Sequence, residues 1–177
     1  MKITLVRHGQ TEQNYLDCIQ GHENNLMNDT GRRQCQKLKY ILKDKHYDFC
    51  YMSPLLRTVE TAIILVGDRV ETAPDKRLIE RNMGELEGKS RDLYDPKKYW
   101  NYNKNCSDLG IEPVQDIFKR CDDFLSYIKE KHEGQSILIV THAAPFRALR
   151  HLLLKTNLYD NLLDINISNC YYEEFEI

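Results

Sequence analysis

The sequence of 177 residues lacks a long apolar run, a large charge excess and an N-terminal segment of the secretory type. Its hydrophobic stretches are too short to cross a bilayer, and no basic stretch followed by a long apolar one opens the chain. A net charge of −2 gives no indication of a nucleic-acid or membrane surface. We therefore expect a soluble, cytoplasmic protein that binds neither nucleic acid nor membrane.

Paired cysteine motifs are also absent, because none of the six cysteines forms a C-x-x-C pair. Cys18 and His22 have a spacing that metal ligands can use, but no second pair follows them. The prediction is therefore no metal site and no cofactor, with the thiols reduced as is usual in the cytosol.

The chain has no internal repeat, no low-complexity tract and no segment that resembles a linker. Hydrophobic residues make up 41% of it and charged residues 29%, which is ordinary for a globular protein. This length is enough for a sizeable core, so the prediction is one domain over residues 1–177. The oligomeric state is not indicated by the sequence.

Short apolar strands alternate with helical patterns along the chain. The predicted strands are 3–6, 48–52, 70–73 and 137–140, with a strand or hairpin from about Ile165. Helices are predicted after Thr30-Gly31, from Ser53-Pro54 with serine as the N-cap, from about Pro113, and after His142. This alternation predicts an α/β sandwich, in which ligands bind at the carboxyl ends of the strands.

Two of the predicted strands end in polar residues that suit phosphate chemistry. Arg7-His8 follows the first strand, and His142 follows the strand at 137–140, just before a helix N-terminus that can offer backbone N–H groups to an anion. Arg57 lies in the second helix, and Glu80 follows the third strand. Phosphoryl transfer needs fixed cations, a nucleophile and a proton donor, and these residue types supply all three.

Each of these residues alone also has an ordinary explanation. A single arginine or glutamate is usually a solvated surface charge, and a single histidine at a strand end is more often structural than catalytic. The residue types and their placement therefore give phosphate binding only as a hypothesis.

Four segments, taken in order, strengthen this hypothesis because they resemble the histidine phosphatase superfamily, the phosphoglycerate mutase-like proteins. They are LVRHGQTEQN at 5–14, SPLLRTVETA at 53–62, LIE at 78–80 followed by Gly84 and Glu87-Gly88, and VTH at 140–142. The resemblance covers nearly the whole chain. It implies a three-layer α/β sandwich with a mostly parallel central sheet and helices on both faces.

The resemblance also implies roles for particular residues. His8 corresponds to the nucleophile that becomes phosphorylated, and Glu80 to the general acid. Arg7, Arg57 and His142 correspond to residues that line the phosphate pocket. The chemistry of the family uses no metal.

Further substrate contacts are implied at three positions: Asn14, the Ala143 amide and, more weakly, Gln20. The chain has Ala143-Ala144 where the family usually has glycine after the late histidine. The alanine keeps its N–H, but its methyl group crowds the approach of a phosphate.

The stretch at about 84–112 has little periodicity and is predicted to be a short lid, or else a partly packed surface loop. Its aromatic residues, among them Tyr94 and Trp100, are candidates for contacts with the organic part of a substrate. This short segment resembles the compact phosphatase branch, which includes the α-ribazole phosphate phosphatases. A short lid leaves a phosphohistidine open to water, which favours hydrolysis.

The resulting prediction is a metal-independent phosphomonoesterase that acts on a small phosphorylated metabolite through a phosphohistidine intermediate. Three alternatives remain open: a phosphoglycerate mutase, a phosphoprotein phosphatase and a non-catalytic phosphate-binding module. The short lid argues against the mutase, and the presence of both His8 and Glu80 argues against a mere binding module.

Overall fold

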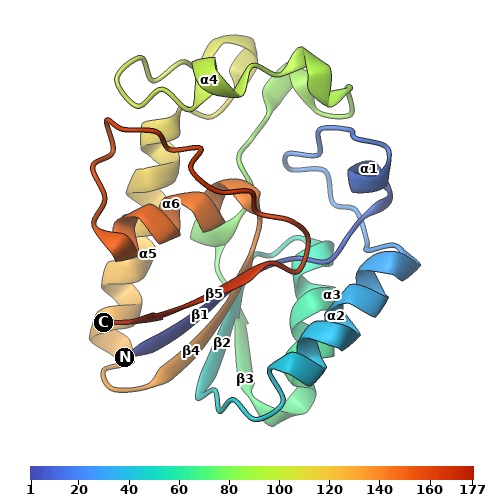
Figure 1. Cartoon of the computed structure of the whole chain (residues 1–177), viewed down its shortest axis with the longest axis vertical. Helices are drawn as coiled ribbons and strands as arrows, with labels where there is room; N and C mark the ends of the chain where they lie inside the picture. The colour runs from blue at the N-terminus through green and yellow to red at the C-terminus, as the bar shows by residue number, and fades with distance from the viewer.

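A five-stranded sheet between two layers of helices forms the centre of the computed structural model, which describes residues 1–177 (Figure 1). The strands are β1 (Lys2–Arg7), β2 (Phe49–Met52), β3 (Glu71–Pro74), β4 (Ser136–Thr141) and β5 (Tyr172–Glu176), in the order β3-β2-β4-β1-β5. The pairs β1–β4, β2–β4 and β2–β3 are parallel, and only β5 is antiparallel to its neighbour β1. The predicted α/β sandwich with a mostly parallel sheet is thus confirmed.

Helices cover both faces of the sheet. Figure 1 shows α2 (Asp29–Ile41) and α3 (Leu56–Val66) on one face, with α5 (Val114–Lys131) and α6 (Ala143–Leu154) on the other. The remaining helical segments are short: α1 (Glu12–Tyr15), α4 (Pro96–Tyr99) and 3₁₀ turns at Gly67–Arg69, Lys76–Leu78, Gly84–Leu86, Arg91–Leu93 and Asp108–Gly110. No helix combines the length and apolar character needed to cross a membrane.

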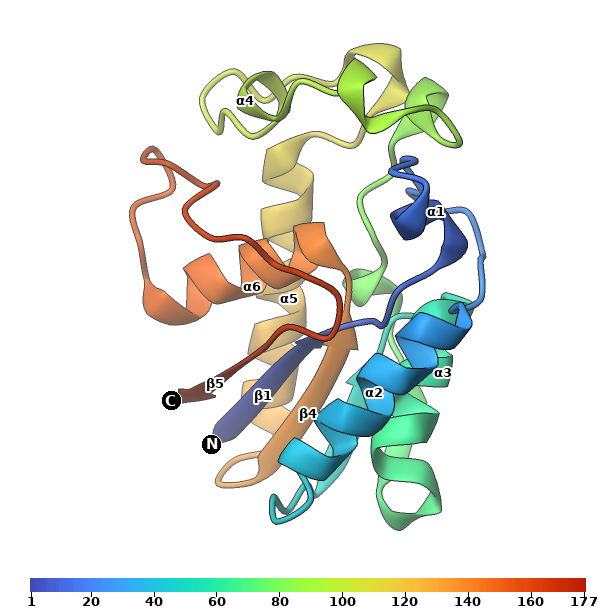
Figure 2. The same cartoon turned by 45° about the vertical axis from the view of Figure 1, so that its right-hand side comes forward.

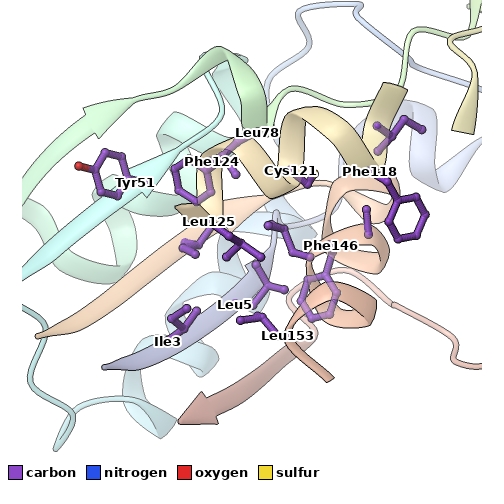
Figure 3. Close-up of a cluster of buried hydrophobic side chains, with 14 of the residues drawn as sticks. Ile3, Leu5, Tyr51, Leu78, Phe118, Cys121, Phe124, Leu125, Phe146 and Leu153 are labelled. Carbon is purple, nitrogen blue, oxygen red and sulfur yellow. The ribbon is translucent and has the colours of Figure 1, made fainter. Parts of the chain in front are cut away.

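Alternation along the strands gives each face of the sheet its own core. Ile3 and Leu5 of β1 face α5 and α6, where they join the larger buried cluster with Phe124 and Phe146 (Figure 3). Val6 points to the opposite face and packs with side chains of α2 and α3. Successive residues of a strand point to opposite faces, so a largely apolar run such as 3–6, in which Thr4 is also buried, fits a strand that is covered on both sides.

The start of α3 differs from its prediction. The helix begins at Leu56, and Ser53 is not its N-cap because its backbone N–H donates to the Val140 carbonyl and prolongs the sheet. The capping acceptor is the distant Asn24, whose Oδ1 lies 2.7 Å from the Leu56 nitrogen. The Ser53 hydroxyl accepts from the Leu55 N–H at 3.3 Å and makes a further contact at the site described below.

Other boundaries also differ from the predictions. The helix expected after Thr30-Gly31 already begins at Asp29, because Asn28 caps it by accepting from the Gly31 N–H. Strand β3 lies one residue later than predicted, on a largely exposed edge where apolar periodicity is weak. The C-terminal tail forms one strand, which starts at Tyr172 rather than near Ile165.

The segment 84–112 passes above the carboxyl ends of the strands, as Figures 1 and 2 show. It is not a loose loop, because its Leu86, Tyr99 and Ile111 form a small buried cluster with Ile19 and Met83. The rings of Tyr94 and Tyr99 are stacked, with centroids 5.3 Å apart. The packed-loop interpretation therefore describes its structure, while a lid function stays a prediction.

Candidate active site

The ends of β1 and β4 bring the two polar segments of the sequence together. Arg7 and Thr141 are paired in the parallel register, and the His8 backbone N–H continues this pairing by donating to the Thr141 carbonyl. A cavity of about 670 Å³ opens at this edge of the sheet, and its wall includes Arg7 and His8. This is the edge at which parallel α/β sheets bind ligands.

His8 is held as a neutral imidazole with a defined tautomer. Its Nδ1 lies 2.7 Å from the Gly9 carbonyl oxygen, which can only accept, so Nδ1 carries the proton. Nε2 makes no hydrogen bond within the protein and keeps its lone pair. Burial, with the nearby charges of Arg57 and Arg7, holds the pKa of His8 well below its usual value. A buried histidine with a free lone pair is suited to nucleophilic attack.

Arg57 reaches the cavity from the first turns of α3 and is fixed on three sides. Its Nη groups donate to the carbonyls of Gly21 (2.9 Å) and Glu23 (2.6 Å), and its Nε donates to Nδ1 of His142 at 3.2 Å. Burial lowers the pKa of Arg57 to about 10, and Glu80 opposes that shift. The guanidinium therefore stays charged at neutral pH, in the cavity wall.

Arg7 is a second buried cation in the same wall. One of its Nη groups donates to the Ile167 carbonyl, while its Nε is buried without a partner. Burial lowers the pKa of Arg7 to about 10, again opposed by Glu80, so this group is also charged at neutral pH. Two rigid guanidinium groups beside one neutral histidine form a strong anion site.

His142 lies behind the residues that form the cavity wall and does not line the cavity itself. It is fully buried, with its ring centroid 5.1 Å from that of His8. Its Nδ1 accepts from Arg57, so Nε2 carries the proton and donates to the Ser53 hydroxyl at 2.7 Å. Burial and the charge of Arg57 hold the pKa of His142 well below its usual value. Both nitrogens are engaged with protein groups, so in this arrangement His142 positions Arg57.

Glu80 lines the cavity and is tied to the start of α6. Its Oε1 accepts from the backbone N–H groups of Arg81 (2.8 Å) and Ala144 (3.2 Å). Ala143, also in the wall, is the first residue of α6, so its N–H has no intrahelical acceptor. The carboxylate and this amide are thus placed on the same rim as His8.

Asn14 and Gln20 complete the set of predicted residues in the cavity wall. Asn14 Oδ1 accepts from the side chain of Asn169 at 3.1 Å, and Gln20 Oε1 accepts from the Thr11 hydroxyl at 2.9 Å. These bonds use the oxygens, which leaves the amide N–H groups as the donors available to an anion. The predicted residues therefore gather at one site, apart from His142, which lies behind it.

Cys18 and His22 do not form a ligand pair. His22 Nε2 lies 2.8 Å from the Glu80 carbonyl, and the Cys18 thiol faces the Leu16 carbonyl. No group of three or more His, Cys, Asp or Glu side chains is arranged to hold a metal ion.

Three arginines that were not predicted as site residues also line the cavity: Arg81, Arg91 and Arg147. The guanidinium groups of Arg81 and Arg147 lie over the ring of Trp100, with Cζ at 5.6 and 5.4 Å from its centroid. Arg81 directly follows Glu80, which was a usable signal in the sequence. The sequence carries no such signal for Arg147, because its place in the cavity wall depends on how α6 is oriented in the fold.

Acid is expected to destabilise the protein through its buried histidines. An unfolded histidine has a pKa near its ordinary value, while the pKa of folded His8 lies well below it. Between these values the unfolded state binds more protons than the folded state. The protein therefore has its full stability above about pH 6.5. As the pH decreases below that value, the free energy of unfolding decreases by up to about 1.4 kcal/mol per pH unit for each histidine.

Urea unfolding of wild type and His8→Asn at about pH 7 and about pH 5.5 checks this expectation. The variant has lost one of the titrating groups, so acidification should reduce its stability less than that of wild type. Equal losses in both proteins would show that His8 does not titrate as described.

The parallel sheet and the arginine-rich wall around a neutral histidine are together typical of a phosphoryl-transfer enzyme. Comparison with known proteins gives the family: the profile of the histidine phosphatase superfamily (branch 1) matches residues 3–177. The chain belongs to this superfamily, as its sequence motifs indicated.

Individual relatives agree with this assignment. Phosphoglycerate mutase-like protein 4 of Arabidopsis thaliana is 33% identical over 84% of this chain and 69% of its own length. Phosphoserine phosphatase 1 of Hydrogenobacter thermophilus is 28% identical over 89% of this chain and 78% of its own. Among solved structures, Bacillus stearothermophilus YhfR is 28% identical, with a TM-score of 0.85 over 99% of this chain and 91% of that one. The prediction of an enzyme of the phosphomonoesterase class is confirmed by the family and its phosphatase members.

Proposed function

We propose that the protein hydrolyses phosphate monoesters of small anionic metabolites through a phosphohistidine at His8. The observation that carries this proposal is the state of His8. The residue is buried and neutral, its Nδ1–H donates to the Gly9 carbonyl, and its Nε2 makes no hydrogen bond within the protein. The charged Arg7 and Arg57 stand in the same wall to bind the phosphoryl oxygens.

The reaction has two steps. In the first, His8 Nε2 attacks phosphorus, the bond to the ester oxygen breaks, and Glu80 gives its proton to the departing oxygen. In the second, the Glu80 carboxylate takes a proton from water, the water oxygen attacks phosphorus, and the P–N bond breaks to release phosphate and restore His8. Dividing the hydrolysis in this way replaces one difficult step by two easier ones. No step uses a metal.

The cavity supports a small anionic substrate. Its volume of about 670 Å³ is in the usual range for metabolite sites, which favours a metabolite over a phosphoprotein. Five arginines line it against two carboxylates, Asp17 and Glu80, so it favours an anion beyond the phosphate. Relatives from Hydrogenobacter thermophilus and Arabidopsis thaliana are named phosphoserine phosphatases, the latter metal-independent, which supports the same class for this chain.

The segment 84–112 is proposed as the lid of this site within a single domain of residues 1–177. Tyr94, Pro96 and Trp100 from it line the cavity, so a bound substrate would contact them. Cytoplasmic localisation is part of the same proposal. It is supported by the six cysteines, all of which are free thiols, as is usual in a reducing compartment.

The test combines a substrate panel with trapping of the intermediate, in buffer containing a chelator. We expect phosphate release from p-nitrophenyl phosphate and from phosphorylated hydroxy and amino acids, with turnover unchanged by the chelator. Acid-labile ³²P should appear on the His8 peptide after rapid quenching. Release of phosphate without label on this peptide would contradict the intermediate, and interconversion of 2- and 3-phosphoglycerate without phosphate release would make the protein a mutase.

A further inference from the structure

Two sulfur atoms lie in contact behind the loop that carries His8. Cys35 on α2 and Cys170, two residues before β5, have their Sγ atoms 3.5 Å apart, although 135 positions separate them in the sequence. Cys35 is fully buried and Cys170 is half-buried. Neither thiol takes part in the proposed mechanism, so the mechanism does not explain why the two sulfurs are in contact.

Both cysteines contact the loop that carries His8. The Cys170 backbone N–H donates to the His8 carbonyl at 3.2 Å, and the neighbouring Asn169 side chain donates to the same oxygen at 3.1 Å. On the other side, a methyl group added at Gly9 would lie only 2.8 Å from Cys35 Sγ. Gly9 is the residue whose carbonyl fixes the His8 tautomer. The sulfur pair is thus packed directly against the groups that orient the nucleophile.

Cys35 also differs chemically from the other buried thiols, while the same contact raises the pKa of its partner Cys170. The Cys170 S–H lies against Cys35 Sγ and stabilises its thiolate, which lowers the pKa of Cys35. Cys50 and Cys121 lie in apolar surroundings, where burial raises their pKa to about 12. A thiol with increased thiolate character next to a second thiol has the features of a redox-active pair.

We propose that Cys35 and Cys170 are an oxidative modification site whose disulfide lowers phosphatase activity, with a peroxide as oxidant. Hydrogen peroxide oxidises one thiol to a sulfenic acid and is itself reduced to water. The second sulfur then attacks the sulfenic sulfur, the S–O bond breaks, and a second water leaves as the S–S bond forms. The overall balance is two thiols and one peroxide to one disulfide and two waters, and a dithiol reverses it.

Disulfide formation changes the packing beside His8. A disulfide bond is about 2.05 Å long, so the two sulfurs have to approach by about 1.5 Å from their present 3.5 Å. Cys35 is embedded in a helix, so we expect the adjustment on the side of residues 169 and 170, which hold the His8 carbonyl. Displacing these groups disturbs the orientation of the imidazole, and small misplacements of a nucleophile are costly to rate.

The experiment treats the full-length protein with hydrogen peroxide and follows both the covalent change and the activity. We expect non-reducing tryptic mass spectrometry to show a Cys35–Cys170 linked peptide, and kcat/KM to fall by at least about 5-fold, with recovery in dithiothreitol. Cys170→Ser should show no peroxide-dependent loss, keeping after peroxide the kcat/KM that the same variant has in reductant. Cys106→Ser, which removes a half-buried thiol outside the pair, should respond like wild type.

The two readouts keep this inference separate from the proposed function on which its activity arm depends. Linked-peptide formation is measured even if no phosphatase substrate is found. Absence of the linked peptide in oxidised wild type overturns the modification site, whatever the variants do. A linked peptide with unchanged kcat/KM, or inactivation of Cys170→Ser equal to that of wild type, overturns the inhibitory role.

Discussion

His8→Ala is expected to lower kcat/KM for p-nitrophenyl phosphate by roughly 10⁴-fold or more, because no other group can accept the phosphoryl in the first step. The neighbouring histidine cannot replace it, since His142 lies behind the cavity wall with both ring nitrogens engaged. Arg7 and Arg57 remain in the variant, so substrate binding should weaken much less than turnover. Steady-state kinetics that separate kcat from KM check this expectation, and the acid-labile label on the protein should disappear.

The matched control is His46→Ala, an exposed histidine that bonds only to Asp48. It should retain wild-type kinetics. The thermal transition of each variant, followed by circular dichroism, shows whether the folded state persists. Comparable turnover in folded His8→Ala and wild type would remove His8 from the role of nucleophile.

The layers of the fold were predictable because each leaves a local signature in the sequence. The run at 137–140 is apolar throughout and the run at 3–6 is apolar except for Thr4, which indicates strands covered on both faces. The pattern after Pro113 repeats at helical spacing. What failed were boundaries that depend on partners distant in sequence. Ser53 has the residue type of an N-cap, but Asn24 caps α3 and the serine hydroxyl accepts from His142.

The site was predictable to the extent that its residues belong to ordered motifs at strand ends. The motifs bring Arg7, His8, Arg57 and Glu80 into one wall, as the structure describes. The motifs do not specify how far a side chain lies behind the cavity surface, so they gave no indication that His142 lies behind Arg57. Arg147 could not be predicted for a related reason. Its side chain lies beside Trp100 only because α6, on one face of the sheet, approaches the segment 84–112, which passes above the carboxyl ends of the strands.

Glu80→Gln should separate the two chemical steps. Glutamine keeps the shape and an acceptor oxygen for the N–H groups of Arg81 and Ala144, but it can neither give nor take the proton. Loss of a positioned general acid typically costs about 10²- to 10⁴-fold in rate. The full loss is expected for alkyl esters such as glycerol phosphate, whose leaving oxygen needs the proton most.

A nitrophenyl ester should respond differently, because its leaving group departs without protonation. Phosphorylation of His8 then stays rapid while hydrolysis of the phosphohistidine slows, since the variant lacks the base that activates water. Stopped-flow measurements should show a burst of nitrophenol close to one equivalent per enzyme, followed by slow turnover and a persistent phosphoenzyme. Glu85→Gln, an exposed carboxylate five residues away, should show neither effect. Equal rate losses for alkyl and nitrophenyl esters, without a burst, would assign Glu80 to electrostatic positioning, because an acid–base group must discriminate between leaving groups.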